Sequence, residues 1–217
     1  MCTDALKTKD LLTKVIKKKF SKKVKFTHTA TQSIRPIYNL CKMNAKQVIQ
    51  NHISKEDKYT FAFNELKGVL GLNKDIKKIE AYDVSHISGD HAVASCVVFS
   101  NLGALKKDYR LFNIPETLSG NDVGSLQHVL ERRIKYYENP KIKPEVILID
   151  GGKTQLNFTQ SVIDSSEYDD IKIISIVKGS NRVRATETIL SNEGIIELEK
   201  YSKAYLLLQE IRDESHR

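Results

Sequence analysis

Two aspartates that follow short β-favouring segments could do metal or phosphate chemistry. Asp150 ends the apolar run in Glu145-Val-Ile-Leu-Ile-Asp150-Gly-Gly-Lys153, and Asp83 follows Ile79-Glu-Ala-Tyr in the same way. A continuous apolar run predicts a strand buried on both faces, and open α/β sheets place their sites at the carboxyl ends of such strands. Two nearby carboxylates repel unless a proton or a cation neutralises one of them, and oxygen ligands favour Mg²⁺ or Mn²⁺. The alternative is that one acid caps a helix and the other only ends a strand.

The sequence after Asp150 contains Gly-Gly-Lys-Thr, which also occurs in nucleotide-binding phosphate loops. That motif needs a glycine five positions before Gly152, where this chain has Ile147 in the middle of a predicted strand. The nucleotide-triphosphatase interpretation therefore fails. We expect Gly151 and Gly152 to let the backbone turn and a phosphate approach the next helix N-terminus, with Lys153 adding a positive charge.

The segment Ile211-Arg-Asp-Glu-Ser-His216-Arg217 places several ionisable groups on one predicted helix. Arg212 and His216 are four residues apart and share a face of that helix. A histidine there could bind metal or carry a proton, although a lone histidine is more often a surface residue. The same holds for the histidines of the strand-rich part, His86, His91 and His128; His28 and His52 lie outside it.

A second basic group, Lys178, Arg182 and Arg184, surrounds Gly179-Ser-Asn181 after the strand predicted over residues 171–177. A basic loop at the carboxyl end of a strand suits nucleic-acid phosphates, but an ordinary solvated loop fits as well. Aromatic residues are not interleaved with this group, so base stacking is not indicated.

Composition limits the class of protein. The 217 residues are 40% hydrophobic and 29% charged, with a formal net charge of +8. This balance indicates a globular chain with a plausible polyanionic partner, although a generally basic protein would have the same charge. Three cysteines without a CxxC pair favour neither a disulfide framework nor structural zinc. With no apolar stretch of membrane-spanning length and no signal-peptide core, we expect a soluble cytoplasmic chain without a membrane partner.

Residues 1–72 are expected to form a basic, mainly helical segment that precedes the strand-rich domain, residues 73–217. Helices are predicted around residues 11–16, over 33–50 and from 61 to 70, with a brief strand at 24–26. The lysine run of the first helix could be a nucleic-acid arm, but a solvated helical face is the commoner explanation.

The strand-rich part has a definite element order. Strands are predicted over residues 79–84, 92–99 and 105–114, with a helix from Asn121 or Asp122 to about Tyr137. The strand that ends at Asp150 follows, then a helix, the strand over 171–177, a hairpin over 186–199 and a helix from Lys203. This order is that of the ribonuclease H-like fold, a mixed sheet of antiparallel and parallel strands with helices on both faces. The first and fourth strands are neighbours in it, so Asp83 and Asp150 should approach each other.

Several segments together resemble the C-terminal half of the UvrC family, the incision subunit of bacterial nucleotide excision repair. The matching stretches are Tyr-Asp83-Val-Ser-His86-Ile-Ser-Gly89, Val93-Ala-Ser-Cys-Val-Val-Phe99, Tyr109-Arg-Leu-Phe-Asn-Ile114, Gly120-Asn-Asp122, Leu148-Ile-Asp150-Gly-Gly-Lys153 and Ile211-Arg-Asp-Glu-Ser-His216-Arg217. The resemblance implies an endonuclease that uses Mg²⁺ or Mn²⁺ to cut damaged duplex DNA 5′ to a lesion. It implies Asp83, Asp150 and His216 as catalytic and metal-binding residues and Asp122 as a further catalytic residue.

The resemblance also has limits. Asn121 and Val123 stand where the family has an aspartate and an aromatic residue. The family's GIY-YIG nuclease, UvrB-binding motif and helix-hairpin-helix pair have no counterpart here, so we expect UvrB contacts mostly through other regions. Lys153, Lys178, Arg182, Arg184 and Arg212 are candidate DNA contacts. The alternatives are a catalytically weak docking module for DNA or UvrB, and a transposase or junction resolvase that shares the strand-borne acids.

Overall fold

The computed structural model describes residues 9–20, 35–87, 91–178 and 187–217. The chain divides into two compact units, residues 1–51 and residues 52–217. The predicted first helix is α2 (Lys9–Phe20), and α3 (Arg35–Val69) begins in the first unit and ends in the second. The brief strand expected at residues 24–26 lies outside the described residues.

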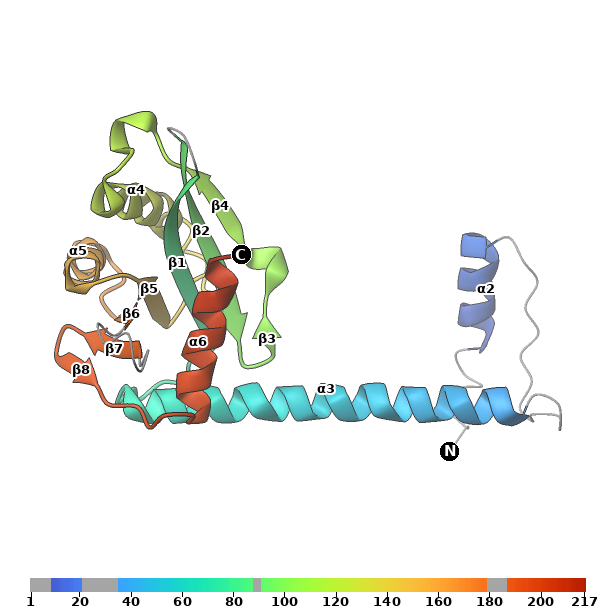
Figure 1. The fold of residues 1–217 in the computed structure, drawn as a ribbon. Coiled ribbons are helices and arrows are strands. Elements are labelled where there is room, and N and C mark those ends of the chain that lie inside the picture. The colour runs from blue at the N-terminus through green and yellow to red at the C-terminus, as the bar shows by residue number, and fades with distance from the viewer. Residues whose placement is uncertain (1–8, 21–34, 88–90, 179–186) are drawn as a thin grey trace. The chain divides into compact units, whose positions relative to one another are not determined.

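The two helices predicted over 33–50 and 61–70 are one helix, α3 (Figure 1). No glycine or proline lies between Gln50 and Phe61, so nothing in the backbone chemistry stops the first segment before the second begins. The helix ends before Gly71, whose φ of +62° suits glycine. Its last turns belong to the core of the second unit, whereas residues 35–46 are exposed.

The second unit is built on one eight-stranded mixed sheet, and the ribonuclease H-like prediction is confirmed. The strands are β1 (Lys78–Ile87), β2 (His91–Ser100), β3 (Gly103–Ala104), β4 (Arg110–Asn113), β5 (Val146–Asp150), β6 (Lys172–Lys178), β7 (Glu187–Ser191) and β8 (Gly194–Ile196). Their order in the sheet is β3-β2-β1-β5-β6-β7-β8, and β4 also pairs with β2. β1, β5 and β6 are mutually parallel, and the other pairs are antiparallel.

The single strand predicted over residues 105–114 is instead two short strands, β3 and β4. A 3₁₀-helix, η1 (Lys106–Asp108), separates them. The Leu105-Lys-Lys-Asp stretch lacks the alternation of a half-buried strand, and the Asp108 carboxylate pairs with Lys78 at 3.1 Å. A second 3₁₀-helix, η2 (Glu116–Leu118), follows β4.

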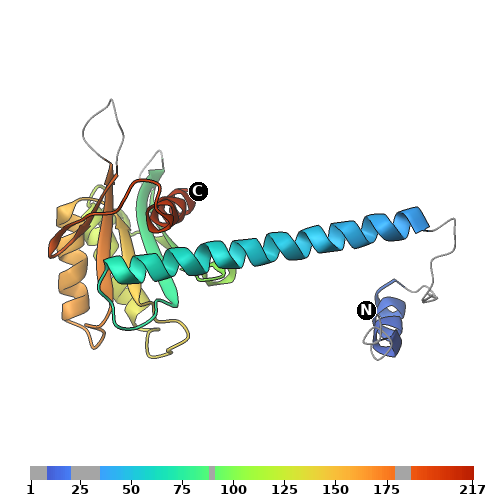
Figure 2. The same ribbon diagram turned by 90° about the horizontal axis from the view of Figure 1, so that it is seen from below.

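Helices cover both faces of the sheet (Figures 1 and 2). On one face, α4 (Asp122–Ile134) and α5 (Lys153–Asp164) pack on Tyr82, Ile147 and Ile149. On the other, α6 (Lys203–Ser215) and the last turns of α3 pack on Ala81 and Leu148. The unbroken apolar run of β5 thus fills two cores because alternate residues point to opposite faces.

The turn chemistry read from the sequence is also observed. Asn121 caps α4 by accepting a hydrogen bond from the Gly124 backbone N–H at 2.9 Å. The hairpin expected over 186–199 is the β7–β8 pair. Among the described helices, no segment is long and apolar enough to cross a membrane.

Candidate metal and nuclease site

Asp83 and Asp150 reach the same place because their strands are adjacent and parallel. Tyr82 pairs with Ile149 in the β1–β5 register, so the two aspartates lie one step further along neighbouring strands. Alternation along each strand turns both carboxylates to the face that carries α6, the face of Ala81 and Leu148. The predicted approach of the two acids is therefore present.

His216 comes to the two acids from the end of α6. Its Nε2 is hydrogen-bonded to Oδ2 of Asp150 and lies 4.0 Å from Oδ1 of Asp83. One ligand atom from each of these three residues lies within 4.8 Å of the others. We call Asp83, Asp150 and His216 the triad.

Two serines hold the triad from the sheet. Ser85, two residues beyond Asp83 on the same strand, donates to Oδ2 of Asp83 at 2.5 Å. Ser95 on β2 donates to the backbone carbonyl of Ser215 at 2.7 Å, which fixes the last turn of α6 against the sheet. Neither serine is among the site residues predicted from the sequence. The period of two from Asp83 could have indicated Ser85, whereas the Ser95 contact joins residues 120 apart and has no local signal.

The donor set fits a divalent cation. Two carboxylates and one imidazole are oxygen and nitrogen ligands that Mg²⁺ or Mn²⁺ can use, with remaining positions left for water or substrate oxygens. The side chains of Asp83, Asp150 and His216 are 14%, 19% and 34% exposed, so the site is open on one side. Such an opening is what a site that receives a polymeric substrate requires.

Gly151 and Gly152 lie between Asp150 and the start of α5, and the expected approach of a phosphate to them stays a prediction. Neither has a positive φ. Gln155 folds back over them, and its Oε1 accepts from the Gly152 N–H at 2.7 Å. A Cβ on Gly151 would lie 2.7 Å from the Gln155 side chain, so Gly151 makes room for this cap of α5. Lys153 is exposed at the first position of that helix.

The other predicted site residues are not part of the triad. Asp122 is exposed at the start of α4 and does not belong to the described group of close ligand atoms. Lys178 ends β6, while Arg182 and Arg184 lie outside the described residues. The Arg212 side chain is only 12% exposed and forms ion pairs with Glu187 and Asp213. Their DNA contacts stay predictions.

Comparison with known proteins identifies a matching family and relatives that cover nearly all of this chain. The family model for the UvrC RNase H endonuclease domain matches residues 67–217. UvrABC system protein C of Saccharophagus degradans is 34% identical over 95% of this chain, and that of Hahella chejuensis is 33% identical over 99%. The chain spans 34% and 36% of the length of these two relatives.

Among solved structures, the crystal structure of human ENDOV covers 65% of this chain and 83% of its own, with a TM-score of 0.39 and 14% identity. The family match extends over all three members of the triad. The chain belongs to the UvrC family and contains its ribonuclease H-like endonuclease domain.

Proposed function

We propose that this chain is the metal-dependent nuclease part of a nucleotide excision repair enzyme, which hydrolyses one phosphodiester of damaged duplex DNA 5′ to the lesion. The convergence of Asp83, Asp150 and His216 within 4.8 Å is the observation that carries the proposal. The names of the relatives, UvrABC system protein C, support the repair context and a complex with UvrB.

Asp83 and Asp150 would hold Mg²⁺ or Mn²⁺, which when bound lowers the pKa of water and stabilises negative charge on a phosphoryl group. The chain's own part is positioning. Ser85 restrains the carboxylate of Asp83, and Ser95 restrains the last turn of α6 next to His216. Asp150 orients the imidazole of His216. Water attacks phosphorus opposite the 3′ oxygen, and breaking that P–O bond leaves a 3′-hydroxyl and a 5′-phosphate.

His216 has two chemically distinct roles available, that of a ligand and that of a proton carrier. Mn²⁺ affinity of His216→Ala separates them. A ligand role predicts weaker Mn²⁺ binding, whereas a proton-carrier role predicts unchanged binding with slower nicking.

Nicking of an end-labelled, lesion-containing duplex in the presence of UvrB tests the proposal. Asp83→Ala and Asp150→Ala should each lower the Mg²⁺-dependent rate by about 10²–10³ or more, because a charge-stabilising group is lost. DNA affinity in the absence of metal should stay nearly unchanged.

Asp164→Ala is the matched control, since this exposed aspartate ends α5 and, among the described residues, accepts a side-chain hydrogen bond from Gln160 of the same helix. It should nick like the wild type. Normal nicking by either triad variant would overturn the proposed mechanism, and DNA binding without nicking by the wild type would favour a docking module.

A further inference from the structure

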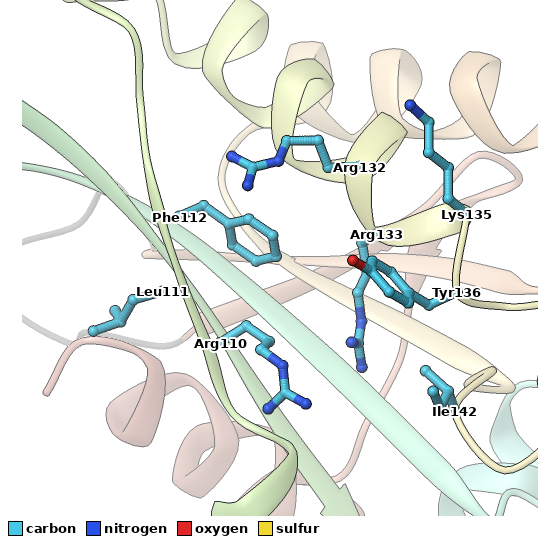
Figure 3. A pocket seen from close by; sticks show the side chains of 8 residues that line it. All are labelled: Arg110, Leu111, Phe112, Arg132, Arg133, Lys135, Tyr136 and Ile142. Carbon is cyan, nitrogen blue, oxygen red and sulfur yellow. The ribbon is translucent and has the colours of Figure 1, made fainter.

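A basic cavity lies on the opposite face of the sheet from the triad. It measures about 600 Å³ and lies between β4, the end of α4 and the loop that follows (Figure 3). We call it the arginine pocket. Its lining consists of Arg110, Leu111, Phe112, Arg132, Arg133, Lys135, Tyr136 and Ile142.

The cations of this pocket are unequally neutralised. Arg133 is buried and gives Nε and Nη2 to the Glu80 carboxylate, at 3.1 and 2.5 Å from Oε1. Among the described residues, Arg110 donates to the backbone carbonyls of Lys107 and Tyr109. Arg132 lies 5.5 Å from the Phe112 ring centre. In the part of the chain that the structure describes, neither Arg110 nor Arg132 forms an ion pair with a carboxylate.

The lining of the arginine pocket includes no carboxylate. Other cavities of the described chain differ: the one beside α6 is lined by Glu210, Asp213 and Glu214, and the one at β7–β8 by three glutamates. Two guanidinium groups without a carboxylate partner, in a concave site between an edge strand and a helix, are suited to bind an anion such as a phosphate. Figure 3 shows them on either side of the Phe112 ring.

The arginine pocket shares two lining residues of β4 with a cavity on the side of the sheet that carries α6. A second cavity, of about 510 Å³, is lined by Ser95 and Ser215, which hold the last turn of α6 next to His216. Arg110 and Leu111 line both cavities. Because β4 pairs only with β2, it is an edge strand that a polymer can cross. Leu111 is 76% exposed at that crossing.

We propose that a backbone phosphate of the DNA strand, some nucleotides away from the scissile bond, binds between Arg110 and Arg132. Guanidinium groups suit phosphodiester oxygens, and the adjacent ring of Tyr136, 61% exposed, offers an apolar surface to the neighbouring sugar. The inference rests on the proposed nuclease function. An acidic peptide would have the same charge, but the lining residues shared with the cavity beside the end of α6 favour DNA.

The test compares Arg110→Gln/Arg132→Gln with Lys77→Gln/Lys200→Gln, which removes the same charge from two exposed lysines away from the pocket. DNA affinity of the full chain is measured without metal over a range of salt concentrations. Loss of this one phosphate contact should reduce the salt slope by about 0.9 for duplex DNA or about 0.7 for a single strand. The control should keep the wild-type slope, and the single variant Arg132→Gln should lose about half as much.

Ethylation interference identifies which phosphate of the DNA binds in the arginine pocket. Ethylation of one phosphate outside the scissile position should weaken binding of the wild type and of the lysine control, and should no longer matter for the arginine variant. Equal slopes and equal interference in all three proteins, with nicking intact, would overturn the pocket assignment alone. Loss of affinity for an acidic partner protein but not for DNA would overturn it too, and absence of nicking by the wild type would instead reject the nuclease function.

Discussion

At the scale of single residues, the triad concentrates negative charge where the sheet opens to solvent. Among the described residues, Asp83 accepts a hydrogen bond from Ser85, and Asp150 accepts one from His216 when the histidine nitrogen carries the proton. Neither acid forms an ion pair with a lysine or arginine among the described residues. A cation bound between the two carboxylates would remove their repulsion, so binding should stabilise the fold.

Added Mn²⁺ should therefore raise the thermal unfolding midpoint of the wild type. At a concentration 100 times the dissociation constant the gain is about 2.7 kcal/mol, because the unfolded chain lacks the assembled site. Asp83→Asn and Asp150→Asn should lose most of this gain. Calorimetry with and without Mn²⁺ measures the shift of the unfolding midpoint, and Asp164→Asn is the control. An equal shift in all variants would show that Mn²⁺ binds outside the triad.

At the scale of elements, the geometry of the triad depends on how α6 and α4 are attached to β1 and β2. The Ser95–Ser215 hydrogen bond fixes α6 on one face. On the other face, Glu80 of β1 is fully buried and accepts from Arg133 of α4 and from the hydroxyls of Tyr82 and Tyr137, at 2.6 and 2.7 Å. Burial raises the pKa values of both tyrosines, so their hydroxyls remain protonated donors.

Ser95→Ala should slow nicking by roughly 3–10-fold while costing about 1 kcal/mol of stability, since one hydrogen bond is lost and His216 is held less firmly. Ser161→Ala removes a similar hydroxyl-to-carbonyl bond, 2.7 Å to Phe158, on α5. This control should lose little activity. Nicking rates at saturating DNA compare the two, and an equal effect would deny Ser95 a positioning role.

Breaking the buried Glu80–Arg133 pair should lower the free energy of unfolding strongly. Glu80→Gln or Arg133→Met leaves an uncompensated buried group and should each cost about 3–5 kcal/mol, whereas the double variant should cost much less than the sum. Urea unfolding of the wild type, the two single variants and the double variant gives the free energies of unfolding for this double-mutant cycle. Glu193→Gln, in the exposed Lys172–Glu193 pair, is the surface control and should leave the midpoint nearly unchanged. Additive costs would contradict strong coupling.

At the scale of the whole molecule, the core on one face of the sheet includes the end of α3, a helix that begins well before the first strand in the sequence. Ala62, Phe63, Leu66 and Leu70, near the end of α3, are buried with α6 in one core. The compact unit that contains this core begins at residue 52, and the domain boundary expected between residues 72 and 73 stays a prediction. The division of function between the two segments stays a prediction.

A shortened chain that begins at residue 52 should unfold cooperatively, and one that begins at residue 73 should not. The chain that begins at residue 73 lacks the buried side chains of Phe63, Leu66 and Leu70. Each contributes about 1.5–3 kcal/mol, and the sum is comparable to the total stability of a domain. Circular dichroism during urea unfolding measures both. Equal stability would show that α3 contributes little to this core.

Much of the fold and the site follows from local patterns. The apolar run before Asp150 predicted a strand buried on both faces, and the element order predicted that Asp83 and Asp150 are neighbours. Other features depend on distant parts of the chain. The role of Gly151 depends on the rotamer of Gln155, and the ion pair of Arg212 depends on Glu187. Periodicity carries no information about such contacts.

The position of His216 on α6 has a consequence for synthesis. Both aspartates and all eight strands precede α6 in the chain, so they leave the ribosome first. A nascent chain can pair β1 with β5 and bring the two acids together while the histidine is still being added. The triad is therefore incomplete until α6 has emerged and docked on β2. An unfinished polypeptide, released early, would hold the two acids without the histidine, so the group of three ligand side chains would be incomplete.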